Sequence, residues 1–132
     1  MASTNRLVPL VARILMAVPF LVFGFLKLKG FHGSVTYLAA LKVPMSTVAA
    51  VIVIIIELLG GLCLVLGFKT RFWAWVMFLY LIPVTFLAHN FWAFTGAARS
   101  DNEAQFVKNI AIMGGLLMLA AFGPGSLSID KA

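Results

Sequence analysis

VAAVIVIIIELLGGLCLVL, from Val48 to Leu66, is an apolar stretch of 19 residues with one charged side chain, Glu57, at its centre. A run rich in Val and Ile is typical of a buried strand, but this stretch is too long for a strand and lacks the alternation of a half-buried one. At about 1.5 Å per residue, an α-helix of this length covers nearly the whole of a hydrocarbon core of about 30 Å. The stretch therefore predicts a transmembrane helix.

The composition of the whole chain agrees with a membrane location. Of its 132 residues, 63% are hydrophobic and 11% are charged, whereas a typical soluble domain has about 45–50% apolar and about 25% charged residues. A soluble protein of this size does not have enough interior to bury so many apolar side chains. The sequence therefore predicts an integral membrane protein with a single transmembrane domain over residues 1–132.

Three further apolar runs bring the predicted number of spans to four. The first run leads into Lys27 rather than into a small-residue cleavage site, which favours a retained span over a signal peptide. The fold class is all-α, a four-helix membrane bundle, with both termini on the same side of the membrane. The predicted spans cover residues 7–26, 48–66, 72–88 and 106–122.

Two shorter segments connect these spans. After a predicted turn at Phe31–Ser34, the apolar residues from Val35 to Leu41 are too few to cross a bilayer, so we expect a short helix lying at the membrane interface. The polar segment from Thr95 to Gln105 is predicted to be a loop.

The net charge of +6 is explained by contacts with lipid. The basic residues gather at the ends of the apolar runs, where they can bind anionic head groups, and this placement argues against a nucleic-acid partner. Their even division between the two sides of the membrane leaves the orientation open. The single cysteine, Cys63, excludes an intrachain disulfide and a CxxC redox pair.

Glu57 lies near the bilayer midplane, where a charge is costly and is usually functional or paired. Arg13, in the first span, is its predicted partner, because helix rise places the two residues at depths that differ by about 5 Å. An arginine can then form a bidentate pair with the carboxylate. The alternative is that Arg13 extends to the head groups and Glu57 is a neutral, hydrogen-bonded acid in the core.

A second group of polar residues falls at one membrane face, at the ends of three spans and in the interfacial segment. Such a group can hold a quinol, an organic anion or a metal, although an ordinary wet interface with aromatic side chains at head-group level has the same composition. Two histidines alone are too few for a metal site, so none is assigned. The candidate ligand site comprises Lys27, His32, Tyr37, His89, Asn90, Trp92, Lys108 and Asn109, with Gln105 beside them.

Several of these residues lie in motifs that together resemble the DoxX-like family of small four-helix membrane proteins. The resemblance covers most of the chain, and it depends on the order and spacing of the motifs because each one alone is common. The motifs are Arg13 with Phe23-Gly24-Phe25-Leu26-Lys27-Leu28, Glu57-Leu58-Leu59-Gly60-Gly61 with Gly67-Phe68-Lys69-Thr70-Arg71, His89-Asn90-Phe91-Trp92, Lys108-Asn109, and Gly123-Pro124-Gly125-Ser126-Leu127-Ser128.

The resemblance implies a bacterial inner-membrane protein in a redox-linked or oxidative-stress system. Its role would be that of a membrane subunit or scaffold, with a quinone as the candidate cofactor and a soluble redox protein or a second copy of the chain as candidate partners. The alternative function is translocation of protons or a solute by the midplane carboxylate of Glu57. No HExxH, GxSxG or nucleotide-binding motif is present, so a stand-alone enzyme ranks last.

Overall fold

The computed structural model describes residues 3–130, and the regular structure in that range is entirely helical. Four of the helices are long and apolar enough to cross a membrane. This result confirms the all-α fold class and the four predicted spans. The elements are α1 (Ser3–Lys29), α2 (Phe31–Ala40), α3 (Ser46–Leu66), α4 (Thr70–Ala88), the 3₁₀ turn η1 (Phe91–Ala93) and α5 (Gly96–Phe122).

The polar segment before the fourth span is helical, so the prediction of a loop from Thr95 to Gln105 was wrong. Helix α5 begins at Gly96, about ten residues earlier than the apolar pattern indicated. The side chains of Arg99, Asp101 and Glu103 are exposed on this extension. A helix that projects beyond the hydrocarbon core needs no apolar face, so hydropathy could not detect its start.

The predicted turn at Phe31–Ser34 is also wrong, because these residues form the first turn of α2. Gly30 alone separates α1 from α2, and the Ser34 hydroxyl donates to the carbonyls of Lys27 and Gly30 across the junction. Helix α2 has ten residues and none of them is buried. At about 15 Å it is too short to cross a bilayer, as expected of an interfacial helix.

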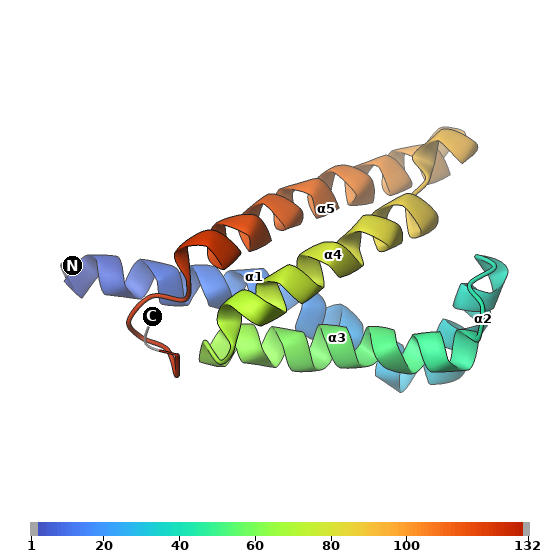
Figure 1. Ribbon diagram of the computed structural model, residues 1–132. Helices are drawn as coiled ribbons and strands as arrows, with labels where there is room; N and C mark the ends of the chain where they lie inside the picture. The colour runs from blue at the N-terminus through green and yellow to red at the C-terminus, as the bar shows by residue number, and fades with distance from the viewer. Residues whose placement is uncertain (1–2, 131–132) are drawn as a thin grey trace.

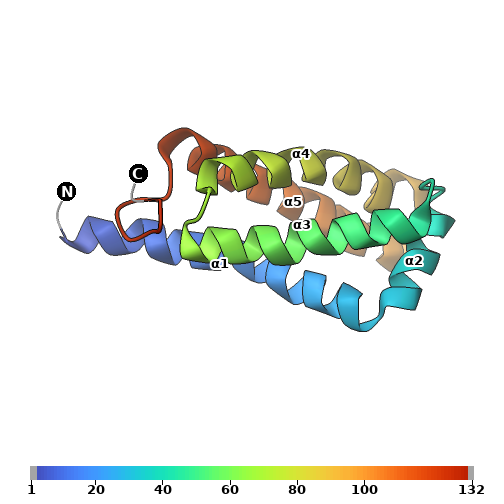
Figure 2. The same cartoon turned by 60° about the horizontal axis from the view of Figure 1, so that its bottom comes forward.

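The helices pack in two pairs, α1 with α3 and α4 with α5 (Figures 1 and 2). The two pairs diverge toward the end at which α2 lies (Figure 1), and α2 packs on α1 and α3 but not, within the described chain, on α4 or α5. The buried apolar core comprises Ala17, Phe20, Leu64, Ala74, Met77, Leu81, Leu116 and Ala120, most of which lie toward the other end of the bundle.

Two glycines set the close approach of α1 to α3. A Cβ atom on Gly24 would lie 2.9 Å from the Cβ of Glu57, and one on Gly61 would lie 2.9 Å from the side chain of Leu21. Small residues at such contacts allow two membrane helices to pack backbone against backbone. The contacts also fix the register of the antiparallel pair, because Gly24 lies opposite Glu57 and Leu21 opposite Gly61.

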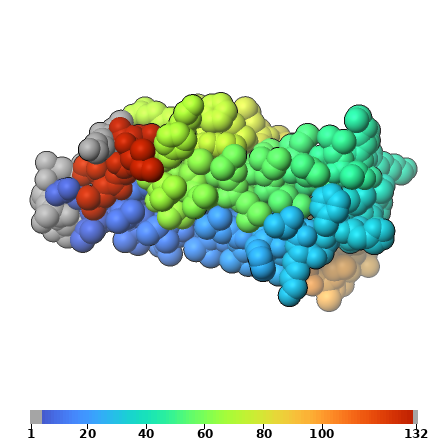
Figure 3. Space-filling model, turned by 90° about the horizontal axis from the view of Figure 1, so that it is seen from below, coloured from blue at the N-terminus to red at the C-terminus, as the bar shows by residue number. Residues whose placement is uncertain are grey.

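The C-terminal segment closes the end of the bundle at which the chain begins and ends. It lies against α1 and the turn between α3 and α4 (Figure 3), and backbone hydrogen bonds join Ile129 to Leu66 and Asp130 to Gly67. The Asp130 carboxylate accepts from the backbone N–H groups of Lys69 and Thr70, both at 2.8 Å. These N–H groups belong to the start of α4, so Asp130 caps that helix from a distant part of the chain.

Candidate ligand-binding site

Arg13 is 1% exposed and does not pair with Glu57. Its guanidinium donates to the backbone carbonyls of Leu64 and Val65, both at 3.1 Å, and to that of Leu127. The predicted ion pair was therefore wrong. The register explains the error, since Glu57 faces Gly24, and the eleven residues from Arg13 to Gly24 correspond to about 16 Å of helix.

The partners of Glu57 are Lys27 and Tyr80. The Lys27 ammonium lies 2.8 Å from Oε1 and the Tyr80 hydroxyl donates to Oε2 at 2.8 Å. The Glu57 side chain is 8% exposed, whereas that of Lys27 is 37% exposed. Lys27 lies one turn after Gly24 on the same face of α1, so the glycine admits the carboxylate between the helices and the lysine neutralises it.

This three-residue cluster lies in the wall of a cavity of about 730 Å³ between the two helix pairs. Residues of all five α-helices line it, and most of them are apolar, including Phe20, Phe23, Leu81 and Val84. Of the predicted site residues, five line the cavity, namely Lys27, Tyr37, His89, Lys108 and Asn109. The cavity also contains Ser34, Glu57, Tyr80 and Gln105.

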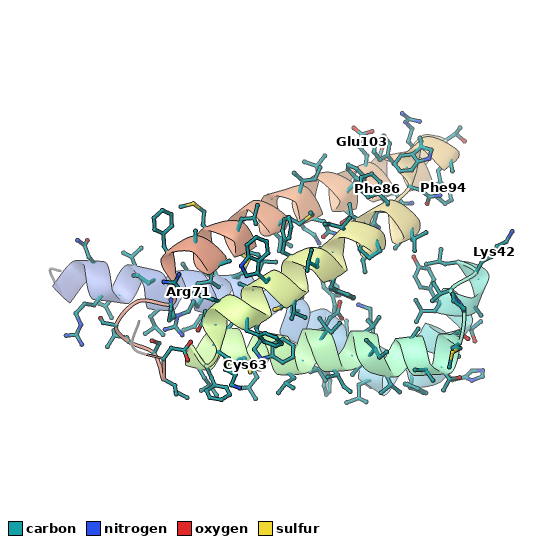
Figure 4. The ribbon with its side chains drawn as sticks, viewed as in Figure 1. Lys42, Cys63, Arg71, Phe86, Phe94 and Glu103 are labelled. Carbon is teal, nitrogen blue, oxygen red and sulfur yellow. The ribbon has the colours of Figure 1, made fainter. Side chains whose placement is uncertain are left out.

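Three predicted site residues lie elsewhere. His32 is exposed on α2, and neither it nor Asn90 is part of the cavity lining. Trp92 packs instead in an aromatic group with Phe86, Phe91 and Phe106, with ring centroids 5.3–6.4 Å apart. This group lies at the α2 end of the α4–α5 pair, near the labelled Phe86, Phe94 and Glu103 (Figure 4), and it is typical of the aromatic belt at a membrane interface.

The wall formed by α4 and α5 carries polar groups with unused hydrogen-bonding capacity. Asn109, 7% exposed, donates to the Thr85 hydroxyl at 3.2 Å, and His89 Nδ1 lies 3.3 Å from the Asn102 side-chain oxygen. No hydrogen bond within the described residues engages Asn109 Oδ1, His89 Nε2 or the Gln105 amide. Lys108 lies with its ammonium 5.3 Å from the centre of the Phe23 ring.

Tyr80 was missed by the sequence analysis. The signal that marks it is a hydroxyl within an otherwise apolar span, because a buried tyrosine hydroxyl usually has a hydrogen-bond partner. Its distance from Glu57 in the sequence gave no indication of the contact. The contact arises because α3 and α4 are consecutive antiparallel helices joined by the short turn at Gly67–Lys69.

Comparison with known proteins places these residues in a family. The DoxX family profile matches residues 8–90, which contain Lys27, Glu57, Tyr80 and His89. The chain belongs to the DoxX family. Two proteins of Escherichia coli K12 are similar along most of their length: the inner membrane protein YphA is 40% identical over 92% of this chain and 87% of its own length, and the inner membrane protein YqjF is 38% identical over 92% and 88%.

A more distant relative of this DoxX-family chain is a Surfeit locus protein 4 homolog of Schizosaccharomyces pombe, which is 31% identical over 84% of this chain but only 34% of the yeast protein. No solved structure matches. The four spans and the bacterial relatives identify the chain as a multi-pass protein of the bacterial inner membrane.

The cavity of this DoxX-family protein suits an amphipathic small molecule. Its volume is within the range of about 300–1,000 Å³ that is common for ligand pockets, and an apolar lining with a few convergent polar groups is the usual pattern. In residues 3–130 no three His, Cys, Asp or Glu side chains gather in a way that could hold a metal ion. The Lys27 ammonium and the side-chain amides of Gln105 and Asn109 can instead donate hydrogen bonds to oxygen atoms of a ligand.

Proposed function

We propose that this DoxX-family protein is the membrane subunit of a redox-linked system and that its cavity binds a quinone. The observation that carries the proposal is the apolar cavity of about 730 Å³ with hydrogen-bond donors on both sides. A quinone head group is a flat apolar ring with carbonyl oxygens on opposite edges. Lys27 on one side of the cavity, and the side-chain amides of Gln105 and Asn109 on the other, have N–H groups left to donate to such oxygens.

In this proposal the protein binds and orients the quinone, and a soluble partner protein supplies or accepts the electrons. The exposed polar extension of α5, Gly96–Gln105, lies outside the apolar part of the helix and offers a surface for that partner. Family membership supports the redox setting only in a general way, so the direct test is quinone binding by the purified protein.

The experiment is a titration of a short-chain naphthoquinone into the protein in lipid nanodiscs, with empty nanodiscs as the baseline. The variants Gln105→Leu and Asn109→Leu should each weaken binding by about three- to tenfold, the usual effect of one lost hydrogen bond. Asn90→Leu is the matched control, because Asn90 does not line the cavity. Binding no stronger than to empty nanodiscs, or equal losses in Asn90→Leu and Asn109→Leu, would contradict the proposal.

Translocation of protons or a solute is a second candidate function. It is favoured by the position of Glu57 at the inner wall of a cavity, with the packed core around Leu64 and Met77 in the other half of the bundle. A carboxylate between an open cavity and a closed end is a common arrangement in transporters. Proton flux into liposomes that disappears in Glu57→Gln but persists in Gln105→Leu would favour this function over quinone binding.

A further inference from the structure

The charges in the cavity do not balance. Lys27 and Glu57 neutralise one another, and theirs is the single salt bridge in residues 3–130. Lys108 is a second ammonium group in the same lining. The other acidic residues of the described chain, Asp101, Glu103 and Asp130, do not belong to the lining. The cavity therefore has an excess of one positive charge, carried by Lys108.

Lys108 extends from α5 toward α1. Its ammonium lies 5.3 Å from the centre of the Phe23 ring, and the Lys27 ammonium lies 5.9 Å from the same centre. A benzene ring attracts a cation through its quadrupole, but it is a weaker partner than a carboxylate and leaves the positive charge uncompensated. Phe23 thus has two cations near it, and only one of them has a counter-charge.

Neutral hydrogen-bonding groups accompany Lys108 on this wall. Gln105 is about one turn before it, and Asn109 is its neighbour on α5. Asn109 is more than nine-tenths buried and still lines the cavity, and in the described part of the chain only one of its two side-chain N–H groups is engaged, by the Thr85 hydroxyl. A buried polar group without a full set of hydrogen bonds is costly unless a ligand or water completes the set.

We propose that the α4–α5 wall binds the ionised acidic group of the ligand and that Lys108 is its counter-charge and a specificity-determining residue. The ligand class is an apolar ring or chain that carries one oxyanion. This inference rests on the proposed function, because both take the cavity as a ligand site. It narrows the ligand class from quinones in general to acidic hydroxyquinones. The same chemistry describes an alkyl carboxylate, so the experiment includes both sources.

The first arm compares two naphthoquinones that differ in charge. A 2-hydroxy-3-alkyl-1,4-naphthoquinone is an anion at neutral pH, and its methyl ether is neutral. In nanodiscs of zwitterionic lipid, the wild-type protein should bind the anion about tenfold more tightly than the ether, which is the effect of one charge-assisted hydrogen bond. Lys108→Gln should abolish this preference with little effect on the ether, and Lys108→Arg should retain it.

The second arm compares an alkyl carboxylate with its methyl ester in the same variants. Lys29→Gln is the control, because Lys29 is an exposed lysine like Lys108 but does not line the cavity. Thermal unfolding of each variant, together with its unchanged affinity for the neutral analogues, shows whether a lost preference reflects a lost site or a misfolded protein.

The outcomes separate the two proposals. If both naphthoquinones bind equally and Lys108→Gln changes neither, the anion site is refuted while quinone binding stands. If no naphthoquinone binds but the carboxylate binds with a preference that depends on Lys108, the anion site stands and the proposed quinone function fails. A preference that Lys29→Gln removes as fully as Lys108→Gln reflects general surface attraction and overturns the inference.

Discussion

Arg13 and Glu57 are both buried charges in membrane-spanning helices, yet their surroundings differ in kind. Arg13 is held by backbone carbonyls of α3 and of the C-terminal segment, at the closed end of the bundle. Glu57 is held by two side chains, Lys27 and Tyr80, in the wall of a cavity. Backbone carbonyls cannot change protonation or move independently of the fold, whereas an ammonium and a phenol can exchange partners with a ligand. The Arg13 site therefore contributes to the stability of the fold, and the Glu57 site is suited to binding a ligand.

The largest expected effect is that of Arg13→Leu. The change leaves three carbonyls without a charged donor and removes the connection between α1, α3 and the C-terminal segment. Hydrogen bonds to charged groups contribute about 1.5–3 kcal/mol each, so we expect a loss of about 3 kcal/mol or more in detergent. Thermal unfolding measures this loss. The control is Arg6→Leu, because Arg6 is exposed and makes one hydrogen bond, to Ser126; equal losses in the two variants would show that Arg13 has no special structural role.

The next effect tests which residue is the partner of Glu57. A double-mutant cycle of Lys27→Met and Glu57→Gln should give a coupling free energy of about 1–2 kcal/mol, because Lys27→Met leaves the buried Glu57 carboxylate without its cation. The corresponding cycle of Arg13→Leu and Glu57→Gln should be additive within about 0.5 kcal/mol. Unfolding in detergent measures both cycles. If Arg13 and Glu57 are coupled while Lys27 and Glu57 are additive, the Arg13–Glu57 pair predicted from the sequence is correct.

The two charges also show how much the sequence could predict. Apolar length alone identified the four spans, and the alternating direction of the helices placed Lys27, Tyr37, His89 and Lys108 at the same end. Those inferences depend only on topology. The pairing of Arg13 with Glu57 required the register of α1 against α3, which depends on the close contacts of Gly24 and Gly61. Such contacts are between residues far apart in the sequence, and no local pattern specifies them.

The ends of the helices and the role of a single hydroxyl could likewise not be predicted from the sequence. The extension of α5 before Gln105 and the first turn of α2 contain no buried residue, so they carry no apolar periodicity. Tyr80 is one tyrosine in an apolar span, and its role follows only from its contact with Glu57. The groups of unusual charge could thus be recognised in the sequence, whereas the neutral residue that completes the hydrogen bonds of Glu57 could not.

A smaller effect tests the glycine that admits Glu57 between the helices. Gly24→Ala places a methyl group 2.9 Å from the Cβ of Glu57, so α1 and α3 must shift apart. We expect a net loss of about 1 kcal/mol, since the strain of overpacking exceeds the gain in helix propensity. The matched control is Gly114→Ala in α5, where an added Cβ meets nothing within 4 Å, and this variant should be neutral or slightly stabilised in thermal unfolding. A stabilised Gly24→Ala protein would show that the close approach does not set the register.

The smallest effect concerns the closed end of the bundle and its dependence on pH. Burial opposes ionisation of Asp130, but the hydrogen bonds from Thr70 and Lys69 and the nearby Arg13 outweigh it and lower the pKa of this carboxyl below its ordinary value of 3.8. A lowered pKa means that the folded state favours the carboxylate, so the contribution to stability is complete above pH 3.8 and is lost as the pH falls through the lower folded value. Acidification through that lower folded value should therefore release the C-terminal segment from the start of α4. The protection of the Lys69 and Thr70 amides against hydrogen exchange, measured relative to the intrinsic exchange rate at each pH, should then fall.

Asp130→Asn should show the reduced protection already at neutral pH and little further change on acidification. Because Asp130 is exposed, the cavity should still bind its ligand at neutral pH in this variant. If the protection of these two amides does not change with pH in the wild-type protein, Asp130 does not hold this end of the bundle closed.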